Sequence, residues 1–293
     1  MRIGLGTAQF GLDYGISNPS GQVAPAEAHE ILALAEESGV RIVDTAAAYG
    51  DSEERLGRLL AKDHPFSIVT KLPRLPDALA PGATRSWVLD AFERSLGHLG
   101  SDRVHGLLIH GAADLLGPRG TELWAALEEL RGAGSVAQVG ASVYTGPEID
   151  ALLKRHPLQL VQVPLNALDQ RLVRSGHLTR LKSAGIEVHV RSVFLQGLLL
   201  MEPARLSNGH FEPARGALGA FQSAARSAGR SPLQAAVAYA MSVPEVDVAI
   251  FGVTSATQFA EILAAATTEL PEDWYAPFAL EDERILDPSR WPR

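Results

Sequence analysis

Four side chains, Asp44, Tyr49, Lys71 and His110, are of the types that together transfer a proton to or from an oxygen atom. A free tyrosine has a pKa of about 10 and is a poor acid–base group near neutrality. An adjacent ammonium group would lower that pKa, and a carboxylate beside the ammonium would keep it charged and oriented. A neutral histidine could hold the reacting oxygen by donating a hydrogen bond. These residue types therefore predict an acid–base site that acts on an oxygen.

Asp44 and Tyr49 lie where a predicted strand ends and a loop begins. The apolar, β-branched run at 40–43 predicts the strand, so Asp44 falls at its carboxyl end and Tyr49 in the loop. Asp51 and Glu54 then have the spacing of a capping box, which predicts the start of a helix. A carboxylate and a phenol are therefore expected at one mouth of a sheet or barrel.

The same order of strand, turn and helix recurs along the chain. Eight short apolar runs are typical of strands, at 3–7, 40–43, 67–70, 104–109, 136–140, 160–163, 186–190 and 246–251. Apolar residues at helical spacing follow most of them, which favours a single-domain (β/α)₈ TIM barrel over residues 1–293 rather than a doubly wound sheet. The active site of such a barrel lies at the carboxyl ends of its strands, where Lys71 and His110 fall.

Two segments interrupt this rhythm, a long connection at 195–215 and a C-terminal tail at 271–293. The tail has little helical periodicity but contains Trp274, Tyr275, Phe278 and Trp291. It could pack against the outside of the barrel or form part of a pocket wall, and both possibilities stay open.

Composition limits the class of protein. With 46% hydrophobic and 20% charged residues, the 293-residue chain is typical of a soluble globular protein with a sizeable core. It has no cysteine, which excludes disulfides, cysteine nucleophiles and thiolate metal sites. The histidines are dispersed, without His-x-x-x-His or similar spacing, so no metal site is predicted.

Charge and hydropathy bear on partners and compartment. The net charge of −8 disfavours a nucleic-acid partner, whose phosphates would repel the surface, and the basic residues are scattered. No run approaches the roughly 18 apolar residues of a membrane span, and the start lacks the apolar region of a signal peptide. We therefore expect a cytoplasmic protein without a nucleic-acid or membrane partner.

The pattern Asp-Thr-Ala-x-x-Tyr-Gly-x-Ser-Glu-x-x-Leu-Gly, from Asp44 to Gly57, resembles the aldo-keto reductase family. The resemblance implies that Tyr49 is the general acid–base and Lys71 its tuner. It also implies that Asp44 is the partner of Lys71 and that His110 orients a carbonyl group. In the resembled family the long connection and the tail contribute to the substrate pocket, so we expect the tail over the carboxyl-end mouth.

The resemblance also implies a nicotinamide cofactor and its binding residues. Ser142, Gln162 and Asn166 look like partners of the nicotinamide carboxamide, and Arg191 stands where many members place an aromatic ring. The N-terminal amides of the last predicted barrel helix suit a phosphate. The remaining expected cofactor residues are Thr7, Ser192, Gly252, Thr254, Ser255 and Gln258.

The expected cofactor is NADP(H), with NAD(H) possible. Members that prefer the phosphorylated form usually place basic side chains after the last strand, but this chain has Thr254 and Gln258 there. It also has Ile262 where an adenine-binding Asn is often found. A hydroxyl and an amide lack the charge-assisted contacts of Arg, so we expect only a small margin of NADP(H) over NAD(H).

The leading hypothesis is an NAD(P)H-dependent enzyme that reduces a small aldehyde or ketone to an alcohol. One alternative is a Schiff-base aldolase acting through Lys71, because barrels also place a nucleophilic lysine at a strand end. Another is a cofactor-binding regulatory subunit that senses redox state with little turnover. The sequence predicts neither the substrate, nor the reaction direction, nor the oligomeric state.

Overall fold

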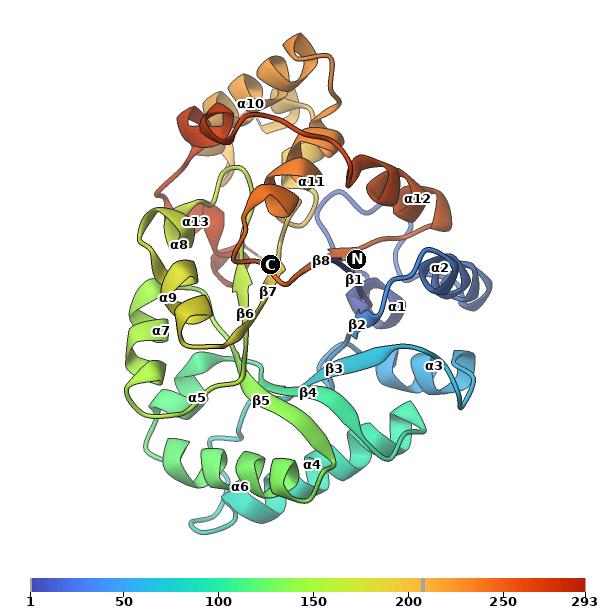
Figure 1. Cartoon of the computed structure of the whole chain (residues 1–293), viewed down its shortest axis with the longest axis vertical. Helices are drawn as coiled ribbons and strands as arrows, with labels where there is room; N and C mark the ends of the chain where they lie inside the picture. Colours follow the sequence, from blue (N-terminus) through green and yellow to red (C-terminus); the bar gives the residue numbers. More distant parts are fainter. Residues whose placement is uncertain (1, 207–208, 293) are drawn as a thin grey trace.

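The computed structural model of the chain describes residues 2–206 and 209–292. Its strands run parallel and close into a barrel in sequence order, with helices around the outside (Figure 1), as predicted. Residues 1, 207, 208 and 293, which include parts of the predicted long connection and tail, lie outside the described residues. The strands are β1 (Ile3–Gly6), β2 (Ile42–Asp44), β3 (Ser67–Leu72), β4 (Val104–Ile109), β5 (Val136–Ser142), β6 (Leu160–Pro164), β7 (Glu187–Arg191) and β8 (Val248–Gly252).

The inside of the barrel is apolar at its middle and polar toward the carboxyl ends. Ile42, Val69, Leu108 and Leu160 pack together inside the strands. Side chains alternate along a strand, so residues two positions further on face the same interior. Those residues are Asp44, Lys71, His110 and Gln162. The apolar cluster is therefore the floor of a polar site.

The main core lies between the strands and the surrounding helices. Each helix buries one apolar face against the barrel, as Ile31 and Leu32 do on α2 and Val88 and Phe92 on α4. The barrel helices are α2 (Pro25–Glu37), α3 (Ser52–Leu59), α4 (Thr84–Leu99), α6 (Gly120–Gly132), α7 (Gly146–Leu153), α9 (His177–Ser183), α11 (Pro232–Ser242) and α12 (Ala256–Ala265).

The predicted capping box of α3 was wrong. Asp51 occupies the N-cap position without a capping hydrogen bond. Its carboxylate accepts instead from Gln22 Nε2 at 2.6 Å and from Arg55 Nε at 2.9 Å. The ion pair with Arg55, one turn along the helix, and the Gln22 amide thus occupy the oxygens that would otherwise accept from the first amides of α3.

Two strands begin later than predicted because turn bonds hold their first residues. Val40 donates to Ala35 O at 2.9 Å, so β2 starts at Ile42. Val246 donates to Val243 O at 3.3 Å, so β8 starts at Val248. The N-terminal Arg2 also binds this turn, donating to Val246 O at 2.8 Å and to Met241 O at 3.0 Å.

The long connection and the tail form short elements, several of which contact α10 (Arg215–Ser227). The connection contains 3₁₀ turns η1 (Leu198–Leu200), η2 (Pro203–Leu206) and η3 (Glu212–Ala214), and the tail contains η4 (Glu272–Phe278), α13 (Glu283–Leu286) and η5 (Pro288–Arg290). The tail aromatics pack against the barrel's helices, and the Tyr275 hydroxyl donates to Ala235 O at 3.0 Å.

Shorter helices at loop positions are α1 (Ala8–Gly11), α5 (Ala112–Leu116) and α8 (Arg171–Arg174). Within the described chain, no helix combines the length and apolar character needed to span a membrane.

Candidate active site

Asp44, Tyr49 and Lys71 meet at the carboxyl ends of β2 and β3. Lys71 Nζ lies 2.8 and 2.7 Å from the two Asp44 carboxylate oxygens, and it also donates to Thr45 O at 3.0 Å. The Tyr49 hydroxyl is 3.5 Å from the same ammonium nitrogen. Asp44 is 4% exposed and Lys71 is 1% exposed, so this ion pair is shielded from water. The Tyr49 hydroxyl is therefore the outer end of the Asp44–Lys71–Tyr49 series.

Close backbone packing fixes the loop that carries Tyr49. Gly11 of α1 lies so near this loop that an added Cβ would be 1.7 Å from Tyr49 O. Gly50 adopts a φ of +57°, which favours glycine, and its own Cβ would be 2.1 Å from Gly11 O. Ser52 Oγ donates within 2.9 Å to the backbone oxygen of Thr7 and ties α3 to the end of β1. Glycines at both contact points are therefore needed to position the phenol.

The pKa of Tyr49 is raised rather than lowered. Burial is the main cause, and the nearby Asp44 carboxylate adds to it, while Arg191 acts in the opposite direction. Burial and the Asp44 carboxylate therefore outweigh the lowering of this pKa that we expected from Lys71. Tyr49 is consequently protonated at neutral pH and can act as a proton donor.

His110 follows β4 and stands beside the phenol. Its ring lies edge-on to the Tyr49 ring, with centroids 5.7 Å apart and an interplanar angle of 82°. Burial, followed by the charges of Lys71, Arg191 and Arg74, lowers the pKa of His110 to about 3. The imidazole is therefore neutral near neutrality, with one N–H available for an oxygen.

His110 should remain neutral down to about pH 4. As the pH is lowered, His110 in the unfolded chain takes up a proton near pH 6.5, whereas in the folded chain it takes one up only at about pH 3. Between these two values the free energy of unfolding should therefore decrease with decreasing pH, and it should decrease more steeply in the native protein than in His110→Asn. Urea unfolding at several pH values measures this difference, and NMR of the ring nitrogens measures the pKa directly. A His110 pKa near 6.5 would contradict the described environment.

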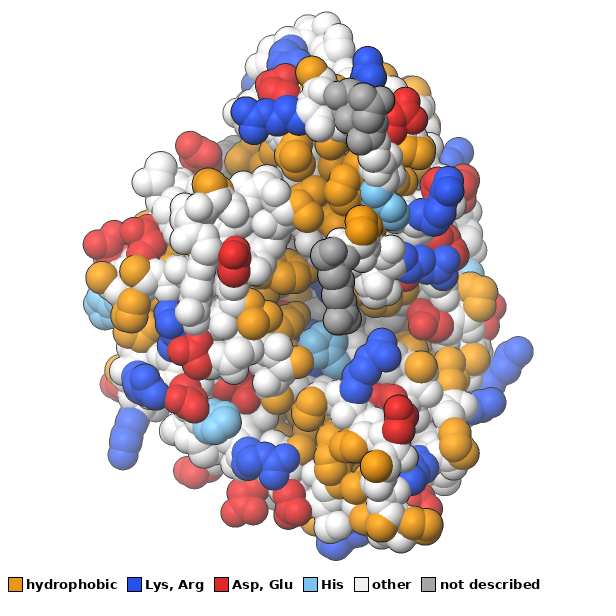
Figure 2. Space-filling view, turned by 180° about the vertical axis from the view of Figure 1, so that it is seen from behind, with side chains coloured by type: hydrophobic (Ala, Val, Ile, Leu, Met, Phe, Trp, Pro, Cys, Tyr) orange, Lys and Arg blue, Asp and Glu red, His pale blue; other side chains and the backbone are white. Residues whose placement is uncertain are grey.

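A cavity of about 580 Å³ opens above these residues. The space-filling view of the face opposite to Figure 1 is hollowed near its middle, with a histidine side chain in the hollow (Figure 2). Lys71, Asn166 and Ser255 do not line the cavity. The predicted site residues that do line it are Thr7, Asp44, Tyr49, His110, Ser142, Gln162, Arg191, Ser192, Gly252, Thr254 and Gln258.

Two amide oxygens in the cavity wall are buried without a hydrogen-bond partner among the described residues. Gln162 donates through Nε2 to Asp44 Oδ1 at 2.7 Å, which leaves its Oε1 unpaired. Gln9 Oε1 is also unpaired and would lie 2.5 Å from a Cβ added at Gly252. Both oxygens could accept from a bound ligand, and the missing Cβ at Gly252 lets the Gln9 amide lie against the end of β8.

Asn166 was predicted to bind a carboxamide, but its side chain holds the loop after β6. Its Nδ2 donates to Ser192 O at 3.1 Å, and its Oδ1 accepts from the amides of Leu168 and Asp169 at 3.0 and 2.9 Å. Local backbone bonds of this kind are common for asparagine in turns. Asn166 therefore positions Ser192 rather than facing the cavity.

Comparison with known proteins agrees with this geometry. The model of the Aldo/keto reductase family matches residues 2–279. The chain belongs to this family.

An aldo-keto reductase from Mycolicibacterium vanbaalenii is 31% identical over 202 residues, which cover 63% of this chain and 64% of that protein. A second relative, aldo-keto reductase Rv2971 from Mycobacterium tuberculosis, is 32% identical over 52% of this chain and only 48% of its own length. The matches thus span less than two thirds of these relatives. The holo form of aldo-keto reductase AKR11C1 from Bacillus halodurans has a similar fold, with a TM-score of 0.75 and 19% identity over 99% of this chain and 95% of that one.

Arg191 departs from the aromatic residue that many aldo-keto reductases carry here. Its guanidinium carbon lies over the ring of Tyr144, 4.1 Å from the centroid. The next residue, Ser192, has a φ of 60°, and Leu195 and Gln196 also adopt left-handed conformations at 48° and 54°. Such backbone strain concentrates at binding sites. Tyr144 was not among the predicted site residues, because no periodicity or turn signal marks a ring that stacks on a distant arginine.

The start of α12 is less free for a phosphate than predicted. Glu27, on α2, accepts from the amide of Ala256 at 2.7 Å. Gln258 Oε1 accepts from the amide of Thr254 at 2.9 Å, and Ser255 Oγ accepts from the amide of Gln258 at 3.2 Å. The protein therefore already satisfies three amides at this helix start.

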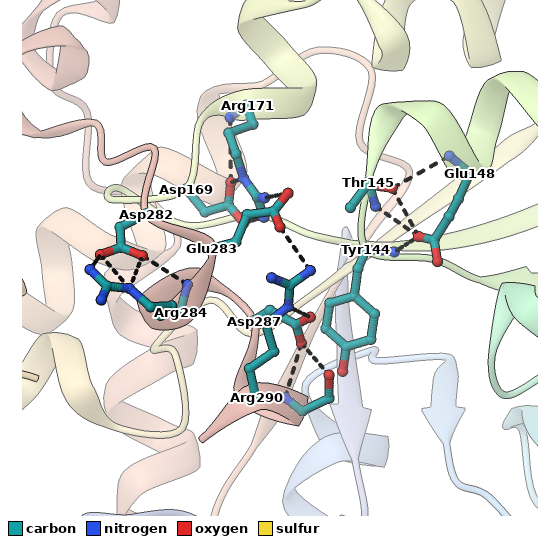
Figure 3. A network of polar contacts seen from close by, with 11 residues as sticks. Tyr144, Thr145, Glu148, Asp169, Arg171, Asp282, Glu283, Arg284, Asp287 and Arg290 are labelled. Carbon is teal, nitrogen blue, oxygen red and sulfur yellow. Dashed lines mark hydrogen bonds and ion pairs between the residues drawn. The ribbon is translucent and has the colours of Figure 1, made fainter. Parts of the chain in front are cut away.

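Ion pairs hold the tail near the same mouth. Figure 3 shows Arg171 beside Asp169, with Nε to Oδ1 at 2.8 Å, and Arg290 beside Glu283 and Asp287, at 2.8 and 3.2 Å. Arg171 also lies 3.6 Å from Glu283, which links the tail to α8.

The tail combines the two possibilities left open by its sequence. Its aromatic side chains belong to the packed core around the barrel, including Tyr275, which is 1% exposed. Further along, Pro288 and Ser289 line the cavity together with Tyr144. The tail is therefore both a packing segment and part of the cavity wall.

Proposed function

We propose that this chain is an NAD(P)H-dependent oxidoreductase that reduces a small aldehyde or ketone to an alcohol in the cytoplasm, as one barrel domain over residues 1–293. The observation that carries the proposal is the buried Lys71–Asp44 pair 3.5 Å behind the Tyr49 hydroxyl, at the floor of a cavity. Family membership supports the same chemistry.

In this proposal Tyr49 donates its proton to the carbonyl oxygen as negative charge develops there. His110 donates a hydrogen bond to the same oxygen from its neutral ring and orients the carbonyl group. The Lys71 ammonium stabilises the phenolate that Tyr49 leaves behind, and Asp44 keeps Lys71 charged and in place. The ion pair therefore contributes most after the proton has moved, since before that step Asp44 offsets its effect on the phenol.

The cavity suits a nicotinamide cofactor, which would supply the hydride when bound. The unpaired Gln162 oxygen fits the N–H of a carboxamide. Ser142 lies opposite Gln162 on β5, and Arg191 of β7 donates to the Ser142 hydroxyl. Gln9, Gly252 and Thr254 would face the more distant part of the cofactor.

A substrate panel tests the proposed function. Purified protein would be assayed with aromatic and aliphatic aldehydes, ketones and aldose sugars, each with NADPH and with NADH. Consumption of the reduced cofactor that depends on the carbonyl compound is expected for at least one class. Binding of a cofactor without turnover of any compound would favour a regulatory subunit instead.

The environment of Lys71 speaks against the aldolase alternative. Its nitrogen is bonded to both Asp44 oxygens, and the side chain is 1% exposed and does not line the cavity. A Schiff-base lysine must be free to attack a carbonyl carbon. Treatment with borohydride and a carbonyl compound should therefore leave Lys71 unmodified.

Thr254→Arg should widen the preference for NADP(H) by about tenfold, because a guanidinium adds a charge-assisted contact to the 2′-phosphate. In the native protein we expect NADP(H) to be favoured over NAD(H). The margin should be small because Glu27 places a carboxylate, which would repel a phosphate, at this helix start. Quenching of tryptophan fluorescence measures both dissociation constants.

Thr257→Arg is a matched control, because Thr257 lies three residues after Thr254, in the first turn of α12, but does not line the cavity. This substitution should leave the ratio of the dissociation constants unchanged. A native preference for NADP(H) of about a thousandfold, or about 4 kcal/mol, would contradict the expected small margin.

A further inference from the structure

The positive charge of Arg191 has no carboxylate partner within hydrogen-bonding distance among the described residues. Its guanidinium donates to Ser142 Oγ at 3.3 Å, to Ser192 Oγ at 3.3 Å and to Val143 O at 3.1 Å, and it stacks on Tyr144. None of these partners is a carboxylate. A cation that lines a partly enclosed cavity in this way acts on any charge that enters it.

The reaction chamber is the part of the cavity at the strand ends, beside Tyr49, His110 and Arg191. Glu261 also lines the cavity, but from α12 rather than from a strand end. The remaining charges of the chamber are balanced or absent. Lys71 is paired with Asp44, and His110 is neutral at physiological pH. Asp287 also acts on Arg191, but this carboxylate is itself 3.2 Å from Arg290. Arg74, beside the residue that follows His110, adds further positive charge from the rim. The chamber therefore carries an excess of positive charge.

We propose that Arg191 makes this site selective for the reduced form of its nicotinamide cofactor. The inference rests on the proposed function. Hydride transfer needs the donor carbon about 3–3.5 Å from the carbonyl carbon, so the nicotinamide ring must share the chamber with Tyr49 and His110. That ring is uncharged when reduced and carries a positive charge when oxidised. The Arg191 charge consequently destabilises the complex with the oxidised form and leaves the complex with the reduced form nearly unaffected.

This selectivity favours the reductive direction kinetically and leaves the equilibrium between carbonyl and alcohol unchanged. Weak binding of the oxidised cofactor speeds its release after reduction and limits the reverse oxidation of alcohols. A stacked aromatic ring at the same position would hold either redox form without this electrostatic penalty.

Direct binding measurements test the proposal without relying on turnover. Isothermal titration of the native protein with NADPH and NADP⁺, and with NADH and NAD⁺, should give at least about tenfold weaker binding of the oxidised form, or about 1.4 kcal/mol. In Arg191→Gln the ratio of the two dissociation constants should fall to within about threefold. Arg191→Lys keeps the charge and should retain most of the native ratio.

Arg85→Gln is the control for a general change in charge. Arg85 is 62% exposed and pairs with Glu129 on the outer surface, so its removal should leave the ratio unchanged. Thermal denaturation would verify that each variant is folded. Equal affinity of the native protein for both redox forms, or an unchanged ratio in Arg191→Gln, would overturn the proposal. A native protein that bound neither form would instead overturn the proposed function, and this inference with it.

Discussion

Tyr49→Phe should lower the rate of carbonyl reduction by about 10²- to 10⁴-fold, which is the range that a positioned general acid contributes. The substitution removes a single oxygen, the one that lies 3.5 Å from Lys71 Nζ. The ring can keep its edge contact with His110, so the shape of the cavity should change little. Steady-state kinetics with the best substrate of the panel would give the change in kcat and in kcat/KM.

The cofactor affinity of Tyr49→Phe shows whether the substitution removes only the proton donor or also disturbs the binding site. Fluorescence titration of Tyr49→Phe should give a cofactor dissociation constant within about threefold of the native value. Tyr14→Phe is a matched control, because Tyr14 also lines the cavity but its hydroxyl makes no hydrogen bond to Lys71, in contrast to that of Tyr49. Near-native turnover by a folded Tyr49→Phe protein would refute the role of the phenol.

Lys71→Met should abolish measurable turnover and destabilise the fold by about 3–5 kcal/mol. Without its partner, Asp44 would remain as a carboxylate that is 4% exposed, with one hydrogen bond from Gln162 to compensate for lost hydration. Such groups take up a proton or unfold the protein. Urea denaturation would measure the change in the free energy of unfolding.

A second substitution distinguishes the unpaired charge from a simple packing defect. In Lys71→Met combined with Asp44→Leu, the buried charge is absent, and most of the lost stability should return. Activity should stay absent in this double variant. If Lys71→Met were as stable as the native protein, the pairing of these residues would contribute nothing to the fold.

The barrel and its central residues could be predicted because both follow from local patterns. Strand periodicity placed Asp44, Lys71 and His110 at carboxyl ends, and the topology of a parallel barrel brings those ends together. The long motif from Asp44 to Gly57 gave the family, which the family match confirms.

The remaining features of the site depend on contacts between distant parts of the chain, which no local pattern encodes. Glu27 binds the start of α12 across 229 positions of sequence. Tyr144 is placed by the side chain of Arg191, and the pKa of Tyr49 depends on how deeply the loop is buried. Asn166 is a local exception: it has the right type for a carboxamide partner, but the amides of its own loop bind its side-chain oxygen.

The closure of the barrel has a consequence for the order of events during synthesis. β1 pairs with β2 but also with β8, where Ile3 is opposite Ala249 and Gly6 opposite Gly252. A chain emerging from the ribosome N-terminus first therefore carries β1 with one open edge until the last strand is made. Open edges of parallel strands can pair with other chains, and contacts of such long sequence separation form slowly. The phenol and its ion pair lie on early segments, but the cavity wall from β8 to the tail is made last. The residues of the proposed acid–base site are thus synthesised well before the segments that complete the cavity.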